Sequence, residues 1–270
     1  KMSFDASGDY LRSLASYRGS DKSGSVSIWL KRVSAQVGTW WHVGNDSPAT
    51  NYFYLYTKSD NTIQMDFNDS SNRTILYSTD TVGSGAWQNI IVTQTGDPDD
   101  SEPLKIYING TKSSQTEHAS LNNVAKHLMW FGNVTNDRFL IGGFDDDGTP
   151  TDLAKGLISQ VAVWGGTTAN ATGAVLSASD VSAIYALGPN GNMKTDYDTS
   201  LVDYWTMGNL TGEGDDMVTS GTTVYSQVTG GVDLTTAGVS APFTGHTISV
   251  NNNTIHKTKQ SVFGGSSIYF

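Results

Sequence analysis

Hydrophobic and polar positions alternate with a period of two along most of the chain, whereas helical periodicity is nearly absent. Each alternating stretch predicts a strand with one buried face. These stretches are residues 25–31, 51–56, 62–67, 87–94, 104–108, 139–143 and 157–164. The apolar residues expected on the inner faces are Ile28, Leu30, Ile90, Val92, Ile106, Ile108, Val161 and Val163.

Two local signals mark a hairpin and a helix. Asn109-Gly110 follows the strand predicted over 104–108 and predicts a two-residue turn, because both central residues of a type I′ turn need positive φ. Residues 177–188 predict one short helix, with Ser177 as the N-cap, Asp180 in the first turn and Gly188 at the end.

The pattern changes after residue 188, where strand-like stretches become shorter and Gly, Thr and Asp more frequent. We therefore expect an all-β protein in two unequal parts. Residues 1–188 should form a two-sheet antiparallel sandwich, which the family resemblance described below makes a jelly roll, and residues 189–270 a smaller β-rich segment with short strands near 223–234, 246–250 and 266–270.

Composition narrows the classes of function. A net charge of −10 with 16 scattered Lys and Arg residues argues against nucleic-acid binding, which needs clustered positive charge. The chain has no cysteine, so its stability must come from packing. No apolar run reaches the roughly 18 residues of a membrane helix, so no membrane insertion is expected. A low charged fraction of 16% with abundant small polar residues suits an extracellular or virion surface.

Five motifs, in order, resemble the laminin-G-like, concanavalin A-like jelly-roll family. They are SFDASGDYL (3–11), SGAWQNIIVTQ (84–94), LKIYINGT (104–111), GLISQVAVW (156–164) and VLSASDVSAIYALG (175–188). Each motif is weak alone, but their order over residues 3–188 is specific. The resemblance implies that the first motif pairs with the fourth, so that the two ends of the sandwich meet.

The segment after residue 188 is similar to the lead-in before further laminin-G-like repeats in bacteriophage structural proteins. The chain closes on GGSSIYF (264–270), which resembles a shortened copy of the opening strand. This stretch is either the edge of a tandem array or an assembly strand that completes a sheet in its own chain or in a neighbouring subunit. The candidate assembly residues are Ser266, Ser267, Ile268, Tyr269 and Phe270.

Catalytic chemistry finds little support in the sequence. The resemblance extends to glycosidases that carry paired carboxylates on an E-x-D-x-x-E strand, and retaining hydrolysis needs two carboxyl groups about 5–5.5 Å apart. Asp66 has no carboxylate two residues away, and the three Glu residues lie in predicted loops or turns. The five His residues are dispersed. We therefore expect no enzyme activity.

Calcium is the only cofactor that we expect, and an acidic loop is the candidate site for it. Ca²⁺ prefers six to eight oxygen ligands, and relatives of the resembled family bind it at a sandwich rim. The candidate ligands are Asp145, Asp146, Asp147, Asn136 and Asp137. The alternative is a solvated charged loop without a metal.

Aromatic residues are the candidates for carbohydrate binding, because the face of a sugar stacks well on an exposed Trp or Tyr ring. The candidates are Trp40, Trp41, Tyr52, Tyr54 and Tyr56. The three Tyr residues share one face of their strand, and Phe53 and Leu55 take the other. The sequence allows two arrangements: an exposed Tyr face, or a Tyr face packed in the core.

Two functions from different classes are consistent with the sequence. The first is a non-enzymatic structural module of a virion or extracellular filament that associates with itself or with other subunits. The second is a calcium-dependent carbohydrate-binding adhesion module, whose partners would be glycans. The absence of a catalytic constellation favours both over an enzyme.

Overall fold

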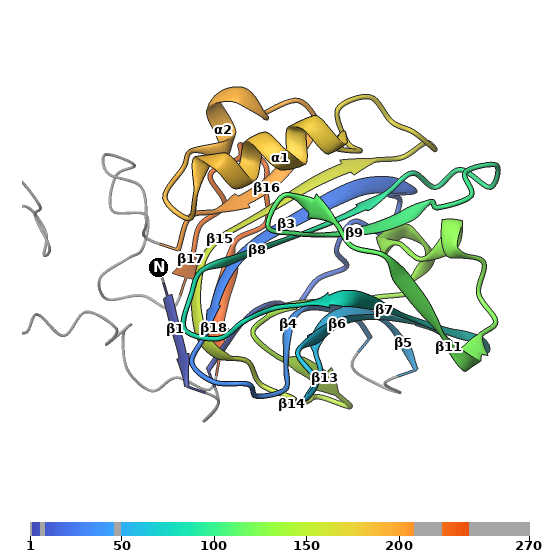
Figure 1. Ribbon diagram of the computed structural model, residues 1–270, viewed down its shortest axis with the longest axis horizontal. Helices are drawn as coiled ribbons and strands as arrows, with labels where there is room; N and C mark the ends of the chain where they lie inside the picture. The colour runs from blue at the N-terminus through green and yellow to red at the C-terminus, as the bar shows by residue number, and fades with distance from the viewer. Residues whose placement is uncertain (1, 6–8, 46–49, 208–222, 238–270) are drawn as a thin grey trace, which may run out of the picture.

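The computed structural model describes residues 2–5, 9–45, 50–207 and 223–237. Within them the chain forms two packed antiparallel sheets, a small separate hairpin and short helices (Figure 1). The predicted all-β sandwich is confirmed. The residues of the predicted assembly strand, 266–270, lie outside the described residues, as does the strand predicted over 246–250.

One sheet has helices on its outer face, and we call it the helix-side sheet (Figure 1). Its strands, in spatial order, are β1 (Met2–Asp5), β15 (Lys155–Gly166), β3 (Ser23–Arg32), β8 (Gln88–Gln94), β9 (Leu104–Ile108) and β10 (Thr111–Lys112), and β16 (Leu201–Trp205) also pairs with β15.

The other sheet has no described helix on its outer face, and we call it the open sheet. Its strands, in spatial order, are β11 (Gln115–Asn122), β7 (Arg73–Thr81), β6 (Thr62–Asp69), β5 (Asn51–Thr57), β4 (Gly38–Gly44), β12 (Arg138–Ile141), β2 (Tyr10–Ser13), β18 (Leu234–Ala237) and β17 (Thr223–Val224). The separate hairpin is β13 (Phe144–Asp146) with β14 (Thr149–Thr151). The helices are η1 (Lys126–Leu128), η2 (Phe131–Asn133), α1 (Ala178–Leu187) and α2 (Met193–Asp196).

Strand β15 joins distant parts of the chain. Its first half pairs with β1, with Phe4 opposite Gly156, as the motif order predicted. Its second half pairs with β16, with Val161 opposite Trp205. Residues beyond 188 thus add β16 to the helix-side sheet and β17–β18 to the open sheet. A separate second unit over 189–270 stays a prediction, because most of that segment lies outside the described residues.

The segment 223–237 is tied to the sandwich by a buried carboxylate. Asp203 of β16 accepts hydrogen bonds from the Val232 N–H at 2.5 Å and from the Tyr17 hydroxyl at 3.0 Å. Burial raises the pKa of Asp203 to about 6. The Trp205 ring donates to the Val232 carbonyl at 2.9 Å. Two strands of different sheets are thereby connected through one loop.

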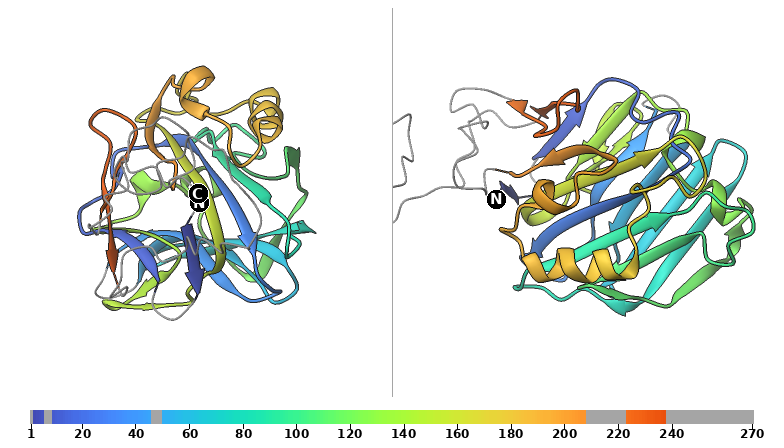
Figure 2. Two further views of the ribbon diagram at one scale, coloured as in Figure 1. Left: turned by 90° about the vertical axis from the view of Figure 1, so that its left-hand side faces the viewer. Right: turned by 90° about the horizontal axis from the view of Figure 1, so that it is seen from above.

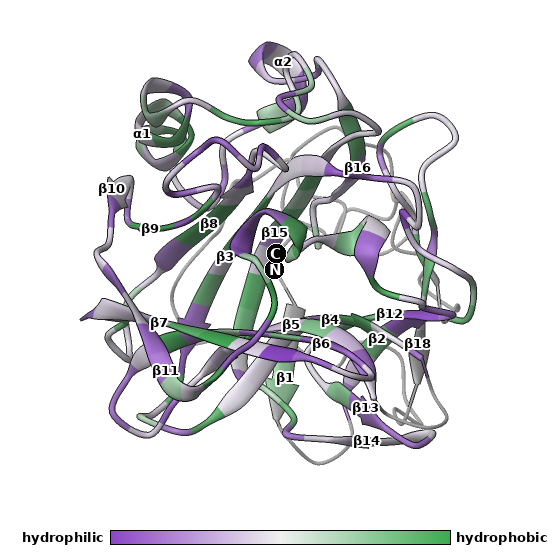
Figure 3. Cartoon of the chain, turned by 90° about the vertical axis from the view of Figure 1, so that its right-hand side faces the viewer, coloured by the Kyte–Doolittle hydropathy of each residue, from purple (hydrophilic) through white to green (hydrophobic). Residues whose placement is uncertain are grey.

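The core lies between the two sheets, and Figure 3 shows them in cross-section as two layers. Every residue predicted for the inner faces is buried there, from Ile28 and Leu30 to Val161 and Val163. Full burial of such a side chain contributes roughly 1.5–3 kcal/mol. The period-two interpretation of the sequence therefore identified the inner faces correctly.

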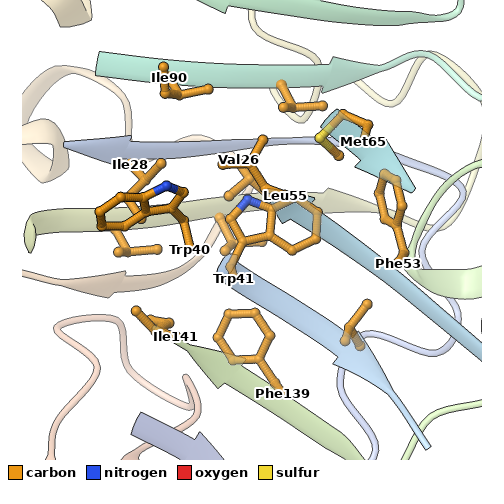
Figure 4. Close-up of a cluster of buried hydrophobic side chains, with 14 of the residues drawn as sticks. Val26, Ile28, Trp40, Trp41, Phe53, Leu55, Met65, Ile90, Phe139 and Ile141 are labelled. Carbon is orange, nitrogen blue, oxygen red and sulfur yellow. The ribbon is translucent and has the colours of Figure 1, made fainter. Parts of the chain in front are cut away.

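Trp40 and Trp41 also belong to this core, which corrects their assignment as sugar-stacking candidates (Figure 4). Their residue exposures are 1% and 0%. The register between β4 and β5 shifts between Thr39 and Trp41, so an irregularity in β4 lets two successive side chains point inward. The Trp40 ring nitrogen donates to the Thr57 hydroxyl. Neither ring is available to a ligand.

The outer face of the helix-side sheet is covered. Apolar residues of β3, β8, β9 and β15, among them Trp29, Ile91 and Trp164, pack against Val181 and Ile184 of α1. Figure 2 shows α1 lying along this face when the molecule is seen from above. Within the described ranges, the outer face of the open sheet carries the β13–β14 hairpin beside β4 and no helix. No helix among the described residues is long and apolar enough to span a membrane.

The predicted turn and helix signals are confirmed. Asn109 and Gly110 both have positive φ, 52° and 79°, between β9 and β10. Helix α1 begins after Ser177, whose hydroxyl accepts from the Asp180 N–H while the Asp180 carboxylate accepts from the Ser177 N–H. This reciprocal arrangement is a capping box.

Replacing Ser177 by alanine is expected to lower the free energy of unfolding by about 1 kcal/mol, because one helix N–H loses its acceptor. Chemical unfolding followed by circular dichroism measures the change. Ser179→Ala, in the first turn of the same helix, is the matched control, with an expected change below about 0.5 kcal/mol. Equal effects of both variants would contradict the capping role.

Candidate functional site

The candidate site lies on the outer face of the open sheet. Phe53 and Leu55 of β5 are fully buried in the core, so the alternation of the strand directs Tyr52, Tyr54 and Tyr56 outward. Tyr54 and Tyr56 are half-buried, whereas Tyr52 is 7% exposed. The question left open by the sequence is therefore answered: the Tyr face is not part of the inter-sheet core.

Neighbouring strands add polar side chains to the same face. Strand pairing places Asp66 of β6 opposite Tyr54, and Gln64 opposite Tyr56. On the other side of β5, His42 of β4 lies opposite Tyr54. Directly opposed side chains in a sheet stand about 4.5–5.5 Å apart at Cβ, so these residues form one continuous surface.

Asp66 is the hydrogen-bonding centre of the surface. Its residue is 0% exposed, and its carboxylate accepts two bonds from Arg73 of β7, at 2.9 Å from Nε and 2.6 Å from Nη2. It also accepts from the Tyr54 hydroxyl at 2.7 Å and from the Gln64 amide at 3.1 Å. Four donors thus hold one buried carboxylate, and the network fixes the orientation of the Tyr54 ring.

The protonation states of the surface are set by burial. Burial and the neighbouring Asp66 carboxylate raise the pKa of Tyr54, so its hydroxyl stays a donor. Burial, together with the positive charge of Arg138, lowers the pKa of His42 to about 3, so the imidazole is neutral near pH 7. Its Nδ1 has no hydrogen-bond partner among the described residues.

The outer face of the β6 strand presents hydrogen-bonding side chains. Gln64, Asp66 and Asn68 occupy alternate positions on one face. Two of the three side chains are amides, which donate and accept hydrogen bonds but do not exchange protons near neutral pH. Asp66 is thus the one carboxylate among these three outward side chains of β6.

The predicted calcium ligands do not converge. The Asp145 carboxylate accepts from Arg138 Nη1 at 3.0 Å, and Asn136 Oδ1 accepts from the Tyr17 N–H at 2.6 Å. Asp146 and Asp147 are exposed on the β13–β14 hairpin. Across the part of the chain that the structure describes, no three His, Asp or Glu side chains are grouped as a metal site. The Arg138 side chain pairs with Asp145 and lies 3.6 Å from Asp137, while Asn136 binds backbone groups. Calcium binding stays a prediction.

The three Tyr residues of the site were predicted from the strand pattern. Its three polar members, Asp66, Arg73 and Gln64, were not predicted. The outward positions of the strand predicted over 62–67 carried the signal, since Gln64 and Asp66 alternate with Ile63, Met65 and Phe67. Arg73 is a contact across strands, which no local pattern indicates.

A two-sheet antiparallel sandwich with one open outer face is the architecture of lectin-like jelly-roll proteins. The chain belongs to the concanavalin A-like lectin/glucanases superfamily, whose laminin-G-like family model matches residues 5–171. The resemblance noted in the sequence motifs is confirmed by this match. No curated protein sequence matches the chain.

Several solved structures are similar to the chain at low identity. A carbohydrate-binding module (CBM40) of the Ruminococcus gnavus IT-sialidase, bound to α2,3-sialyllactose, is 18% identical over 61% of this chain and 83% of its own, with a TM-score of 0.47. A heptameric SAP-like pentraxin from Limulus polyphemus is 16% identical over 69% and 82%, with a TM-score of 0.47. The NanB sialidase of Streptococcus pneumoniae is 14% identical over 68% and 27%, with a TM-score of 0.46. These likenesses concern the fold alone.

Proposed function

We propose that the protein is a non-catalytic carbohydrate-binding module and that it binds a glycan on the outer face of the open sheet. The observation that carries the proposal is the combination of half-buried Tyr54 and Tyr56 rings with the polar groups of Gln64 and Arg73 on one face that no described helix covers. Aromatic rings bury the apolar face of a sugar, while amide and guanidinium groups bind its hydroxyls.

Rigidity supports the same proposal. A flexible surface would lose conformational entropy when a weakly bound sugar orders it, and a network that is ordered beforehand avoids this cost. The Tyr54 hydroxyl and the Gln64 amide are both held by the buried Asp66 carboxylate. The face is thus arranged before any ligand arrives.

The structural-module hypothesis rests on the closing stretch 264–270, which lies outside the described residues. The two hypotheses are compatible, since a module that displays a binding face outside a cell or on a particle can also take part in assembly. No described contact favours assembly over glycan binding.

Replacing Tyr56 by alanine is expected to weaken glycan binding about tenfold or more, which corresponds to about 1.4 kcal/mol. The ring is half-buried and makes no hydrogen bond to another described residue, so its removal should change the unfolding free energy by less than about 1 kcal/mol. A glycan array identifies ligands of the wild type, and calorimetry with the strongest ligand gives the affinities. Tyr225→Ala is the matched control, because this Tyr is 38% exposed and belongs to the segment beside β17.

Absence of binding by the wild type to any glycan, with calcium and with chelator, would contradict the proposal. Equal losses in Tyr56→Ala and Tyr225→Ala would place the ligand elsewhere on the molecule. Binding that disappears with chelator would support calcium dependence, and the described residues provide no assembled site for that ion.

A further inference from the structure

The β13–β14 hairpin stands against one side of the proposed glycan-binding face. In Figure 1 it lies on the outer side of the open sheet, beyond β4. Phe144 carries the contact: its ring meets Tyr52 at 5.4 Å, Tyr54 at 5.2 Å and His42 at 4.7 Å between centroids, in each case edge to face. The Tyr face therefore ends at the Phe144 ring.

Backbone hydrogen bonds fix the base of the hairpin. The Thr39 N–H of β4 donates to the Asp152 carbonyl at 2.7 Å, and the Ala154 N–H donates to the Gly142 carbonyl at 2.9 Å. Beneath the hairpin, Leu153 packs on Tyr10 and Leu140, which are buried on the outer side of the sheet. Both ends of the hairpin are thus held to the open sheet.

A buried ion pair fixes its first strand. Asp145, 1% exposed, accepts from Arg138 Nη1 at 3.0 Å through one oxygen and from the Gly148 N–H at 2.8 Å through the other. The carboxylate joins the hairpin turn to β12 of the sheet. Asp145, which the sequence suggested as a calcium ligand, thus connects the hairpin to the sheet. This connection fixes the hairpin as a wall beside the Tyr face.

On the opposite side of the face, the part of the chain that the structure describes forms no comparable wall. From Gln64 on β6 the face extends to Tyr77 on β7 and to Thr116 on β11, which are paired in register. Tyr77 is half-buried, with Lys58 Nζ 4.3 Å from its ring centroid, and Thr116 is exposed. With neighbouring strands about 4.8 Å apart, this open stretch beyond β5 is about 14 Å wide.

We propose that the site takes the end of a glycan chain and that Phe144 is the specificity-determining residue that stops it. The inference rests on the proposed function and adds the ligand class. The last sugar lies on Tyr54 and Tyr56 against the Phe144 wall, and the remaining sugars run across β6 and β7 toward β11. An internal segment of a long chain cannot lie in this position, because its continuation meets the Phe144 ring.

Matched oligosaccharides test the proposal. Each glycan that the wild type binds is prepared in three forms: unmodified, extended by one hexose at the non-reducing end, and extended by one hexose at the reducing end. Calorimetry is expected to show that one extension weakens wild-type binding at least tenfold and that the other leaves it within threefold. The sensitive extension identifies which chain end meets the wall.

Phe144→Ala is expected to bind the glycan with the sensitive extension with an affinity within threefold of that for the unmodified glycan. Phe144→Val is the second variant, since a β-branched residue suits a strand and shortens the wall if alanine loosens the hairpin. Tyr225→Ala is the control and should keep the wild-type discrimination. Melting curves confirm that the variants are folded.

The outcomes separate the two proposals. If the wild type binds all three forms within threefold, or if both folded Phe144 variants keep the discrimination, the chain-end inference is wrong while glycan binding stands. If no glycan binds the wild type, the proposed function fails and the inference fails with it.

Discussion

Alanine in place of Arg73 is expected to lower the free energy of unfolding by about 3 kcal/mol. Removing one partner of a buried ion pair leaves an uncompensated charge, a change that costs about 3–5 kcal/mol. The low end applies here because the Arg73 side chain is 36% exposed, although that of Asp66 is 0% exposed. Urea unfolding followed by fluorescence measures the change.

Two further variants distinguish a buried charge from a merely lost contact. Asp66→Asn in the Arg73→Ala background removes the unpaired charge and keeps an acceptor for Tyr54, so it should recover part of the lost stability. Lys58→Ala breaks an exposed pair with Asp60 at 2.8 Å and should cost less than about 1 kcal/mol. An Arg73→Ala effect no larger than that of Lys58→Ala would show that Asp66 is well solvated or otherwise compensated.

Alanine at Trp41 is expected to cost about 3–5 kcal/mol, because it removes a large ring from a close-packed core. The ring contacts Phe53 at 5.2 Å and Phe131 at 5.6 Å between centroids. Trp41→Phe should lose less, since it fills part of the volume. Thermal unfolding gives the stabilities, and binding is measured below the melting temperature.

The binding measurement decides whether Trp41 is a core residue or a sugar platform. A folded Trp41→Phe protein should bind the glycan as the wild type does, because Trp41 lies behind the sheet with 0% exposure. Selective loss of binding with little loss of stability would contradict the burial of this ring.

Much of the fold could be predicted from alternation alone, for a physical reason. In a strand the side-chain period is two, so one apolar residue on an inner face determines the face of its neighbours. Ile28 and Leu30 followed that rule, and so did Phe53 and Leu55. Trp40 and Trp41 lay outside the predicted strands, and the register shift in β4 turns both of these successive side chains inward, which alternation alone does not predict.

The acidic loop shows a different difficulty. Asp147 and Gly148 have φ values of 54° and 81° and form the two-residue turn between β13 and β14. Asp-Gly is a hairpin signal of the same kind as Asn109-Gly110. The cluster of acidic residues indicated a metal site instead. The Arg138 side chain that pairs with Asp145 lies on another strand, and no local sequence pattern indicates this pairing.

The candidate site was predictable only in part. Strand alternation placed Tyr54 and Tyr56 on one face, but it could not say whether that face was covered. Coverage depends on where α1 packs, and α1 lies on the other sheet. The Asp66–Arg73 pair depends on the β6–β7 register, and the Phe144 wall depends on a hairpin that folds back over its own sheet.

One edge of β15 pairs with β1 along its first half and with β16 along its second half, and this division has a consequence for synthesis on the ribosome. The stretch from Val161 to Trp164 emerges well before residues 201–205, which pair with it. During that interval a nascent chain presents unpaired backbone groups next to an apolar surface, and such an edge is a template for another chain. The stretch matched by the family model ends at residue 171, so this edge is completed by residues that follow it. A chain cut at the end of α1 would keep the edge exposed and would be prone to aggregate.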